Sequence, residues 1–372
     1  MDNFRFRPQV YKFDHFKVFV DAFEIGENDF ILTNECIYEP FIRPLNLAAD
    51  FLFQEKYGIG EPSDEMIHRI IAAKPRKHYK RIIAIGGGTV IDIAKLLVLK
   101  RGDKVVDIFE RKVPLVKDKE LIIVPTTCGT GSEVTNIVIA EIKERQTKMG
   151  LVADELYADC AVLIPELLKG LPFKFFISSS IDALIHAIES YVSPKSNGYT
   201  ELYSAKAIEM ILKGYLEILD KGEDYRFEIL ADFLVASNYA GIAFDNTGVG
   251  AVHALSYPLG GKYHVPHGEA NYQFFTEVFK NYNRLNPTGK IKEVNKILAS
   301  ILKIAEEKEP YNKLEDVLNE LLRKRKLREY GMTEEEIPVF TDRVMATQRR
   351  LLANNYIPLT REEILAIYKN LY

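Results

Sequence analysis

The stretch Ile82–Lys95, IIAIGGGTVIDIAK, joins an apolar strand, a glycine turn and the start of a helix. Gly86, Gly87 and Gly88 lack Cβ atoms, so the backbone can turn tightly and approach a ligand closely. A helix that begins after such a turn presents unpaired N–H groups and its positive dipole end, which suits a pyrophosphate. The stretch is neither a GxGxxG fingerprint nor a P-loop, and alone it also fits an ordinary tight turn.

Other short apolar segments on either side of this stretch continue the same alternation. The predicted strands are Asp29–Thr33, Ala49–Gln54 and Leu121–Val124, and Asp64–Ala73 has apolar residues at helical spacing. Strands that alternate with helices predict a parallel sheet with helices on both faces. We therefore expect an α/β domain in the first half of the chain.

A second polar loop, Pro125–Glu133 (PTTCGTGSE), follows the strand LIIV. Its hydroxyl groups and glycines offer many hydrogen-bond donors at the carboxyl end of a parallel strand, where ligands of open α/β sheets bind. Together the two loops predict a dinucleotide site, although an ordinary polar loop is the alternative. No activating base is evident near Cys128, so we do not expect this residue to be a nucleophile.

Long helical patterns dominate the second half of the chain. They cover Asp182–Tyr191, Glu201–Leu219, Arg226–Ala240, Lys292–Ala305, Met332–Leu352 and Arg361–Leu371. Gly170–Ser180 contains glycine, proline and a serine run, so we place the domain boundary there, between residues 1–177 and 178–372. The serines before Asp182 are expected to cap the helix that follows.

Composition and charge exclude several classes of function. The chain has 372 residues, enough for two domains, and a formal net charge of −4, which argues against nucleic acid as a partner. We find no apolar run long enough to span a membrane and no signal pattern at the N-terminus. Three cysteines without CxxC spacing suit a reducing compartment, so we expect a cytoplasmic protein.

A candidate metal site involves an aspartate and three histidines. Asp182 and His186 are four residues apart, so on a helix they share one face and can bind Fe²⁺, Zn²⁺, Ni²⁺ or Mn²⁺. By itself this pair also fits a surface salt bridge. His253 and His267 come from a glycine- and proline-interrupted segment, and His267 follows Pro266 as the expected start of a new helix.

At these residues the sequence resembles the iron-containing (group III) alcohol dehydrogenases over nearly its whole length. The family's GGGSxxD loop matches Gly86–Asp92 with Thr89 in place of serine, and PTTxGTGSEVT matches Pro125–Thr135. The metal helix xDAxxHAxExYxS matches 182–193, and two later histidines fourteen apart match His253 and His267. Several segments, among them FQEKYGIGEPSDEMI and the terminal YKNLY, are closer still to members that act on 4-hydroxybutyrate.

The resemblance implies a dehydroquinate synthase-like fold, with an α/β dinucleotide-binding domain, an all-α domain and the active site in the cleft. It implies a metal held by Asp182, His186, His253 and His267. It also implies NAD as cofactor, with contacts from these residues: Asn34, Gly86, Gly87, Gly88, Thr89, Asp92, Thr126, Thr127, Thr130 and Lys148. Family members are commonly dimers or larger, so we expect a homodimer or larger homo-oligomer.

The sequence departs from the family pattern at two positions. Asn34 stands where many members carry an aspartate for the adenosine ribose, and asparagine cannot repel a 2′-phosphate, although it can still bind a hydroxyl. Tyr257 stands where many members have a histidine that relays the alcohol proton. Tyr257, His264, a water chain or the ribose hydroxyls remain alternatives for this role. Lys262, beside the metal loop, is a candidate for binding a substrate carboxylate, although a solvated loop lysine is the simpler interpretation.

We therefore expect an NAD-linked dehydrogenase of a short alcohol or aldehyde, best matched by 4-hydroxybutyrate and succinate semialdehyde. The metal would act as a Lewis acid on the hydroxyl oxygen, and hydride would pass between the carbinol carbon and the nicotinamide. Fe²⁺ and Zn²⁺ accept the same ligand set. Alternatives are a dehydrogenase of butanol, 1,3-propanediol or lactaldehyde type, a polyol-phosphate dehydrogenase or dehydroquinate synthase-like enzyme, and an inert nucleotide-binding or assembly protein.

Overall fold

The apolar strand that precedes the three glycines lies in the middle of a parallel sheet in the computed structural model. The structure describes residues 3–100, 104–145, 147–305 and 310–372. All neighbouring strands of this sheet run parallel. In spatial order the strands are β1 (Gln9–Lys12), β8 (Cys160–Leu163), β5 (Glu120–Pro125), β4 (Arg81–Gly86), β2 (Asp29–Thr33) and β3 (Asp50–Phe53).

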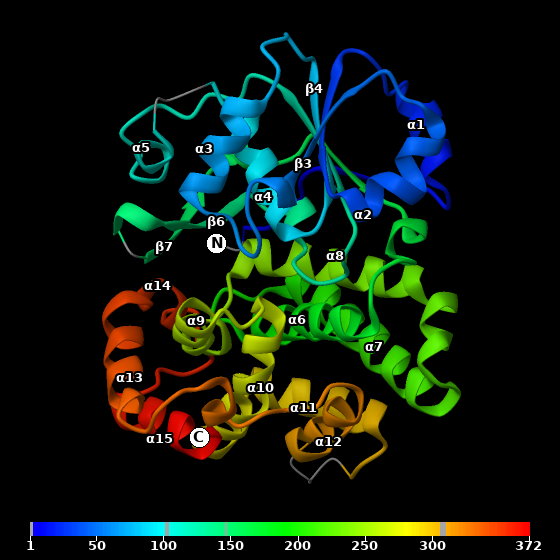
Figure 1. Ribbon diagram of the computed structural model, residues 1–372. Coiled ribbons are helices and arrows are strands. Elements are labelled where there is room, and N and C mark those ends of the chain that lie inside the picture. Colours follow the sequence, from blue (N-terminus) through cyan, green and yellow to red (C-terminus); the bar gives the residue numbers. More distant parts are fainter. Residues whose placement is uncertain (1–2, 101–103, 146, 306–309) are drawn as a thin grey trace. The chain divides into compact units, whose positions relative to one another are not determined.

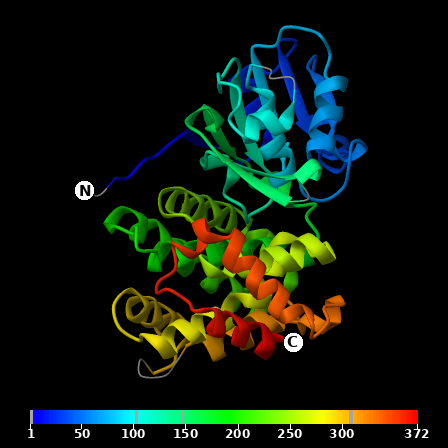
Figure 2. The ribbon, with the colours of Figure 1, turned by 90° about the vertical axis from the view of Figure 1, so that its left-hand side faces the viewer.

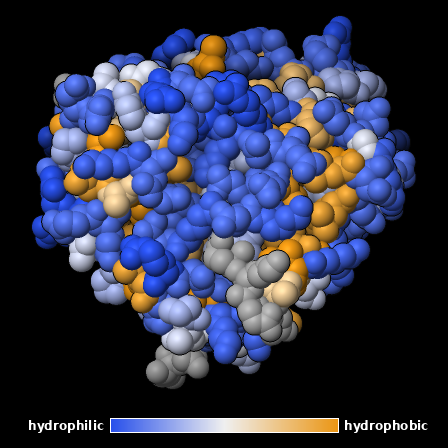
Figure 3. Space-filling model, turned by 90° about the horizontal axis from the view of Figure 1, so that it is seen from below, coloured by the Kyte–Doolittle hydropathy of each residue, from blue (hydrophilic) through white to orange (hydrophobic). Residues whose placement is uncertain are grey.

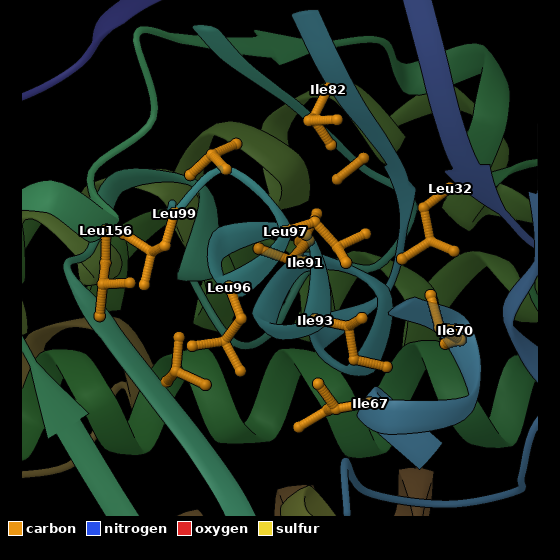
Figure 4. Close-up of a cluster of buried hydrophobic side chains, with 14 of the residues drawn as sticks. Leu32, Ile67, Ile70, Ile82, Ile91, Ile93, Leu96, Leu97, Leu99 and Leu156 are labelled. Carbon is orange, nitrogen blue, oxygen red and sulfur yellow. The ribbon is translucent and has the colours of Figure 1, made fainter. Parts of the chain in front are cut away.

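Both faces of the sheet are buried, as the uninterrupted apolar strands predict. Along β4 the side chains alternate, so Ile82 and Ala84 pack into one hydrophobic cluster, whereas Ile83 and Ile85 pack into another. Figure 4 shows the first cluster, in which Ile82 of the sheet lies with Ile91 and Ile93 of the glycine-loop helix. The helices of this unit are α1 (Phe16–Phe23), α2 (Glu35–Ile37), α3 (Asp64–Ala73), α4 (Gly88–Leu97) and α5 (Val105–Phe109), and a hairpin is formed by β6 (Ile137–Ile142) and β7 (Thr147–Val152).

The second unit is helical (Figures 1 and 2). Its helices are α6 (Phe173–Val192), α7 (Gly198–Lys221), α8 (Leu230–Thr247), α9 (Ala251–Tyr263), α10 (His267–Leu285), α11 (Lys290–Leu302), α12 (Tyr311–Leu321), α13 (Glu336–Thr347), α14 (Arg349–Leu352) and α15 (Arg361–Leu371). The predicted fold class, an α/β unit followed by an all-α unit, is confirmed. No helix in the described parts of the chain is long and apolar enough to cross a membrane. The molecular face in Figure 3 is mainly hydrophilic, with apolar residues between the polar ones.

The two units divide between Leu171 and Pro172, and residues 3–5 belong with the helical unit. The sequence placed this boundary six residues later, after residue 177. Helix α6 begins at Phe173, so the serine run lies inside the helix and not in a linker. Ser178, Ser179 and Ser180 do not cap the helix as predicted, because each hydroxyl donates to the carbonyl oxygen three residues before it, at 3.1 to 3.3 Å.

Candidate metal centre and dinucleotide-binding loops

Three helices of the second unit bring four metal-ligand side chains together. Asp182 and His186 lie one turn apart on α6, His253 lies in the first turn of α9, and His267 is the first residue of α10. One ligand atom from each residue lies within 4.8 Å of those from the other three. Residues 85 positions apart in sequence (267 − 182) thus lie close together, as the family resemblance implied.

The chemistry of this donor set fits a divalent transition metal. The Nε2 atoms of His253 and His186 are 3.0 Å apart, and the carboxylate oxygens of Asp182 lie 3.7 Å from His253 Nε2 and 3.8 Å from His267 Nε2. Two nitrogens that share one ion at about 2.1 Å each are separated by about 3.0–3.4 Å. An aspartate with three imidazoles accepts Fe²⁺ or Zn²⁺. The residues present therefore fit the expected metal.

Burial and charge favour the ionised form of the aspartate. Asp182, His186 and His253 are all at most 4% exposed, whereas the side chain of His267 is 35% exposed. Burial acts to raise the pKa of Asp182, but the three histidines and an amide hydrogen bond outweigh it, so this pKa lies below its usual range. The site thus holds a ready anionic ligand, and the exposed edge of His267 gives it an opening toward solvent.

Glu189, which sequence reasoning did not assign to the site, holds His253 in place. One oxygen of this buried carboxylate lies 2.7 Å from His253 Nδ1, and the other accepts the backbone N–H of Val252 at 2.8 Å. A proton on Nδ1 leaves the lone pair of Nε2 for the metal. Burial acts to lower the pKa of His253, but Glu189 and Asp182 outweigh it and raise this pKa. The sequence did contain a sign of this role, because Glu189 is the glutamate of the family's metal-helix motif.

Asn271 has a similar role for the aspartate. Its Nδ2 donates to Asp182 Oδ1 at 2.7 Å and lies 3.1 Å from His267 Nε2, and its Oδ1 accepts from Ser256 Oγ at 2.5 Å. Asn271 is fully buried one turn into α10. This amide therefore fixes the orientation of the carboxylate. No spacing in the sequence predicts the contact, because the two residues are 89 positions apart.

We predict that Glu189→Gln weakens metal binding about 10–100-fold without unfolding the protein. A glutamine side chain has only one oxygen, so it cannot accept hydrogen bonds from both Val252 and His253. Either the N–H of Val252 loses its acceptor, or an NH₂ group faces His253 Nδ1, which then carries no proton, and the ring proton moves to Nε2. Metal dissociation constants from competition titration with Zn²⁺ and anaerobic Fe²⁺ measure the effect.

Glu293→Gln is the matched control for this change. Glu293 on α11 accepts from the hydroxyl of Tyr191 at 3.0 Å, near the end of the same helix α6, and a glutamine carbonyl can do the same. If the metal affinity of Glu189→Gln lies within threefold of that of this control, the Glu189 carboxylate does not determine the orientation and protonation of His253.

The two glycine- and threonine-rich loops lie side by side in the α/β unit. β4 pairs with β5 so that Gly86 lies opposite Pro125, and the N–H of Thr126 donates to the carbonyl oxygen of Gly86 at 3.1 Å. An added Cβ at Gly88 would lie 3.1 Å from Thr130 Cγ2. The two loops thus form one continuous edge beside the α4 N-terminus, an arrangement that is compatible with the predicted pyrophosphate site.

The remaining predicted cofactor residues differ in their surroundings. Thr127 is partly exposed and would lie 3.5 Å from a Cβ added at Gly87, and Thr89 Oγ1 donates to the carbonyl oxygen of Gly60 at 2.9 Å. Lys148 on β7 forms an ion pair with Glu61 at 2.6 Å. Asn34 lies at the end of β2. All of these residues, with Gly86 to Gly88, Thr126 and Thr130, belong to the same unit.

Asp92 is engaged within the protein rather than directed at solvent. Its two oxygens accept from Ser132 Oγ at 2.8 Å and from the N–H of Ile139 at 2.9 Å. The buried ammonium of Lys95 donates to the same Ser132 hydroxyl at 2.9 Å. Burial raises the pKa of Asp92 in spite of Lys95. In this arrangement Asp92 ties α4 to the second loop and to β6, and a role in shaping the loop fits better than a direct cofactor contact.

Three further predicted residues lie on or at the end of helix α9, which carries His253. The ring of Tyr257 lies one turn beyond His253 on this helix, 6.4 Å from the ring of His267. His264 ends α9 in a left-handed conformation and is exposed. Lys262 is exposed and ion-paired with Glu336 of α13, which commits its charge to an internal carboxylate. Cys128 is buried, consistent with no nucleophilic role, and none of the three cysteines forms a disulfide bond.

Comparison with known proteins gives the class to which this fold and these residues belong. A model described as the C-terminal part of the Fe-containing alcohol dehydrogenase family matches residues 176–372, and one described as iron-containing alcohol dehydrogenase matches residues 18–165. The chain belongs to the iron-containing alcohol dehydrogenase family.

Individual relatives narrow the comparison. The chain is 63% identical over 365 residues to 4-hydroxybutyrate dehydrogenase of Clostridium kluyveri, covering 98% of each chain. It is 32% identical to long-chain-alcohol dehydrogenase 1 of Geobacillus thermodenitrificans over 84% of this chain and 80% of that one. A solved structure of 1,3-propanediol oxidoreductase shares the fold, with a TM-score of 0.85 at 22% identity over 100% of both chains. Sulfoacetaldehyde reductase of Bifidobacterium kashiwanohense, solved in complex with NAD⁺, gives a TM-score of 0.83 at 21% identity, covering 100% of this chain and 98% of that one.

Proposed function

We propose that the protein is a metal- and NAD-dependent dehydrogenase that interconverts 4-hydroxybutyrate and succinate semialdehyde. The reaction takes 4-hydroxybutyrate and NAD⁺ to succinate semialdehyde, NADH and a proton. The 63% identity to the Clostridium kluyveri enzyme over nearly the whole chain supports this substrate. The observation that carries the chemistry is the cluster of Asp182, His186, His253 and His267, which unites every ligand that the family motif requires.

In this proposal these four residues hold Fe²⁺, and Zn²⁺ suits the same donors. A bound divalent ion supplies Lewis acidity, which lowers the pKa of an alcohol hydroxyl and polarises an aldehyde carbonyl. Asp182 is the only charged side chain among the four ligands, so a divalent ion with these ligands would have a net charge of +1 (2 − 1), which favours an anionic oxygen. Glu189 and Asn271 keep His253 and Asp182 in the orientation that this function requires.

The loops at Gly86–Gly88 and Thr126–Thr130 are proposed to bind the pyrophosphate of NAD. Their backbone N–H groups and hydroxyls are neutral donors, and the α4 N-terminus adds favourable electrostatics for phosphate. The nicotinamide supplies the hydride chemistry, and the protein's part is to align C4 with the substrate carbon and to exclude water.

Tyr257 is our candidate for carrying the alcohol proton. It lies on the same helix face as His253 and near the ring of His267, whereas His264 lies at the exposed end of α9. His267, the most exposed of the four ligands, borders the reacting groups in this proposal. We further propose a cytoplasmic homodimer or larger assembly, and three cysteines that form no disulfide bond support a reducing compartment.

The substrate proposal predicts a strong preference for an aldehyde that carries a carboxylate. We expect kcat/KM with NADH to be about 10–100-fold higher for succinate semialdehyde than for butyraldehyde, because a charge-assisted hydrogen bond to the carboxylate contributes about 1.5–3 kcal/mol. Steady-state kinetics under anaerobic, iron-replete conditions measure the ratio. Equal values for the two aldehydes would remove 4-hydroxybutyrate as the substrate and leave a general short-chain alcohol dehydrogenase.

Lys262→Ala tests which cation serves that carboxylate. Because Glu336 already pairs with Lys262, we expect this variant to keep the preference for succinate semialdehyde.

A further inference from the structure

Asn34, directly after β2, is hydrogen-bonded to a carboxylate that follows the neighbouring strand β3. Asn34 Nδ2 donates to Glu55 Oε2 at 2.7 Å, and the backbone N–H of Glu35 donates to Glu55 Oε1 at 2.6 Å. Both partners of this carboxylate lie directly after β2, although Glu55 itself follows β3. Glu55 is therefore fixed at the carboxyl end of β2. It places a negative charge there, next to the uncharged side chain of Asn34.

The sheet order puts this carboxylate within reach of an adenosine ribose. β2 lies between β4, which carries the glycine loop, and β3, and Thr33 of β2 is in register with Phe53 of β3. Strands are about 4.8 Å apart, so the ends of β2 and β3 lie about 5–10 Å from the loop that faces a pyrophosphate. The adenosine ribose is joined directly to that pyrophosphate, and in dinucleotide-binding folds an acidic side chain in this region binds its 2′-hydroxyl.

The hydrogen bonds of Glu55 leave it both charged and able to accept more. The amide of Asn34 and the N–H of Glu35 are neutral donors, so they hold the carboxylate without cancelling its charge. Each carboxylate oxygen has a second lone pair that can accept from a ribose hydroxyl. The nearby ammonium of Lys56 forms an ion pair with the Glu35 side chain at 2.6 Å. The two glutamates and one lysine together keep a net charge of −1 (1 − 2).

We infer that Glu55, held by Asn34, selects NAD over NADP in this chain by accepting hydrogen bonds from the adenosine ribose and repelling a 2′-phosphate. The inference rests on the proposed use of NAD and adds the residue that sets the choice of cofactor. Asparagine alone at position 34 would bind a hydroxyl without excluding a phosphate. The charge needed for exclusion comes from 21 residues further along the chain.

The test compares binding of ADP-ribose and 2′-phospho-ADP-ribose, which needs neither metal nor alcohol. Dissociation constants are measured by isothermal titration calorimetry for the wild-type protein and for Glu55→Gln. Loss of the anionic acceptor is expected to lower the affinity for ADP-ribose about tenfold. Loss of the repulsion is expected to raise the affinity for 2′-phospho-ADP-ribose about tenfold. The ratio of the two affinities should therefore decrease about 100-fold. The ratio of kcat/KM for NADH and NADPH should shift in the same direction.

Two further variants separate charge from position. Asn34→Ala removes a donor that holds Glu55 but keeps the charge, so ADP-ribose should weaken without any gain for the 2′-phosphorylated ligand. Glu27→Gln makes the same change of charge before the first residue of β2, at an exposed position. It lies about 16 Å from Glu55 along the strand, beyond the Debye length of about 8–10 Å, and should leave the ratio unchanged.

A ratio in Glu55→Gln that equals that of Glu27→Gln, or a wild-type protein that binds both ligands equally, would overturn the role of Glu55 and leave the dehydrogenase function standing. Failure of the wild-type protein to bind ADP-ribose at all would overturn the use of NAD and this inference together.

Discussion

The His267→Ala variant is expected to bind the metal about 10²–10³-fold more weakly than the wild-type protein. A four-ligand site contributes about 10–16 kcal/mol of binding free energy, so loss of one ligand removes about a quarter of it. Activity should fall at least as far. His267 is the first residue of α10 and its side chain is 35% exposed, so its removal leaves no large buried cavity. Metal content after anaerobic dialysis, circular dichroism and NADH oxidation with succinate semialdehyde measure the three quantities.

His264→Ala is the control for this variant. His264 lies three residues earlier, is exposed, and is not among the four clustered residues. It should keep its metal and fold as the wild-type protein does. Full turnover by a metal-stripped His267→Ala enzyme would contradict both the metal site and the proposed chemistry, whereas an unfolded variant would show up directly in the circular dichroism spectrum.

Gly268→Ala is expected to disrupt the centre through the backbone rather than through a ligand. A Cβ at position 268 would lie 2.3 Å from the carbonyl oxygen of Ser178 and 3.3 Å from Asp182 Cβ. The contacted atom belongs to the backbone of α6, which cannot move by itself, so the added methyl group must push α6 and α10 apart. We expect a loss of about 1–3 kcal/mol or more in the free energy of unfolding. His267 and Asp182 would then move apart. If this costs about 1.4 kcal/mol or more of metal-binding free energy, metal affinity falls about tenfold or more.

Gly261→Ala provides a matched comparison. Gly261 is an exposed glycine inside α9, and nothing lies within 4 Å of a Cβ added there. This variant should gain about 0.5–1 kcal/mol from helix propensity and keep its metal affinity. Urea unfolding of the metal-free proteins and competition titration with Zn²⁺ separate the two effects. Unchanged metal binding in Gly268→Ala would mean that the two helices do not need this close approach.

Local patterns predicted most of the sheet because burial on both faces leaves a clear apolar signature. Asp29–Thr33 is a strand as predicted, and α3 and α15 have the predicted bounds. The predicted helix at Met332–Leu352 is instead broken into α13 and α14, and α6 begins nine residues before Asp182. Serine hydroxyls that bond back to the preceding turn are compatible with a helix, so the serine run was a poor signal for a boundary.

The supporting residues of the two sites were harder to predict, because their contacts depend on tertiary structure. Asn271 meets Asp182 across 89 residues, and Glu55 meets Asn34 across two parallel strands. Asp92 belongs to the family's glycine-loop motif, yet its oxygens bond to Ser132 and Ile139, some 40 and 47 positions away. A motif identifies which residues matter, whereas only the packed chain distinguishes a group that binds a ligand from one that holds the binding loop.

The ligand cluster also has a consequence for how the helical unit resists unfolding. Its four side chains come from α6, α9 and α10, so an ion bound there ties together three helices that the chain joins only through loops. By thermodynamic linkage, free metal at 100 times its dissociation constant adds about 2.7 kcal/mol to the free energy of unfolding. Removal of the metal is therefore expected to lower the free energy of unfolding of the helical unit as well as the activity.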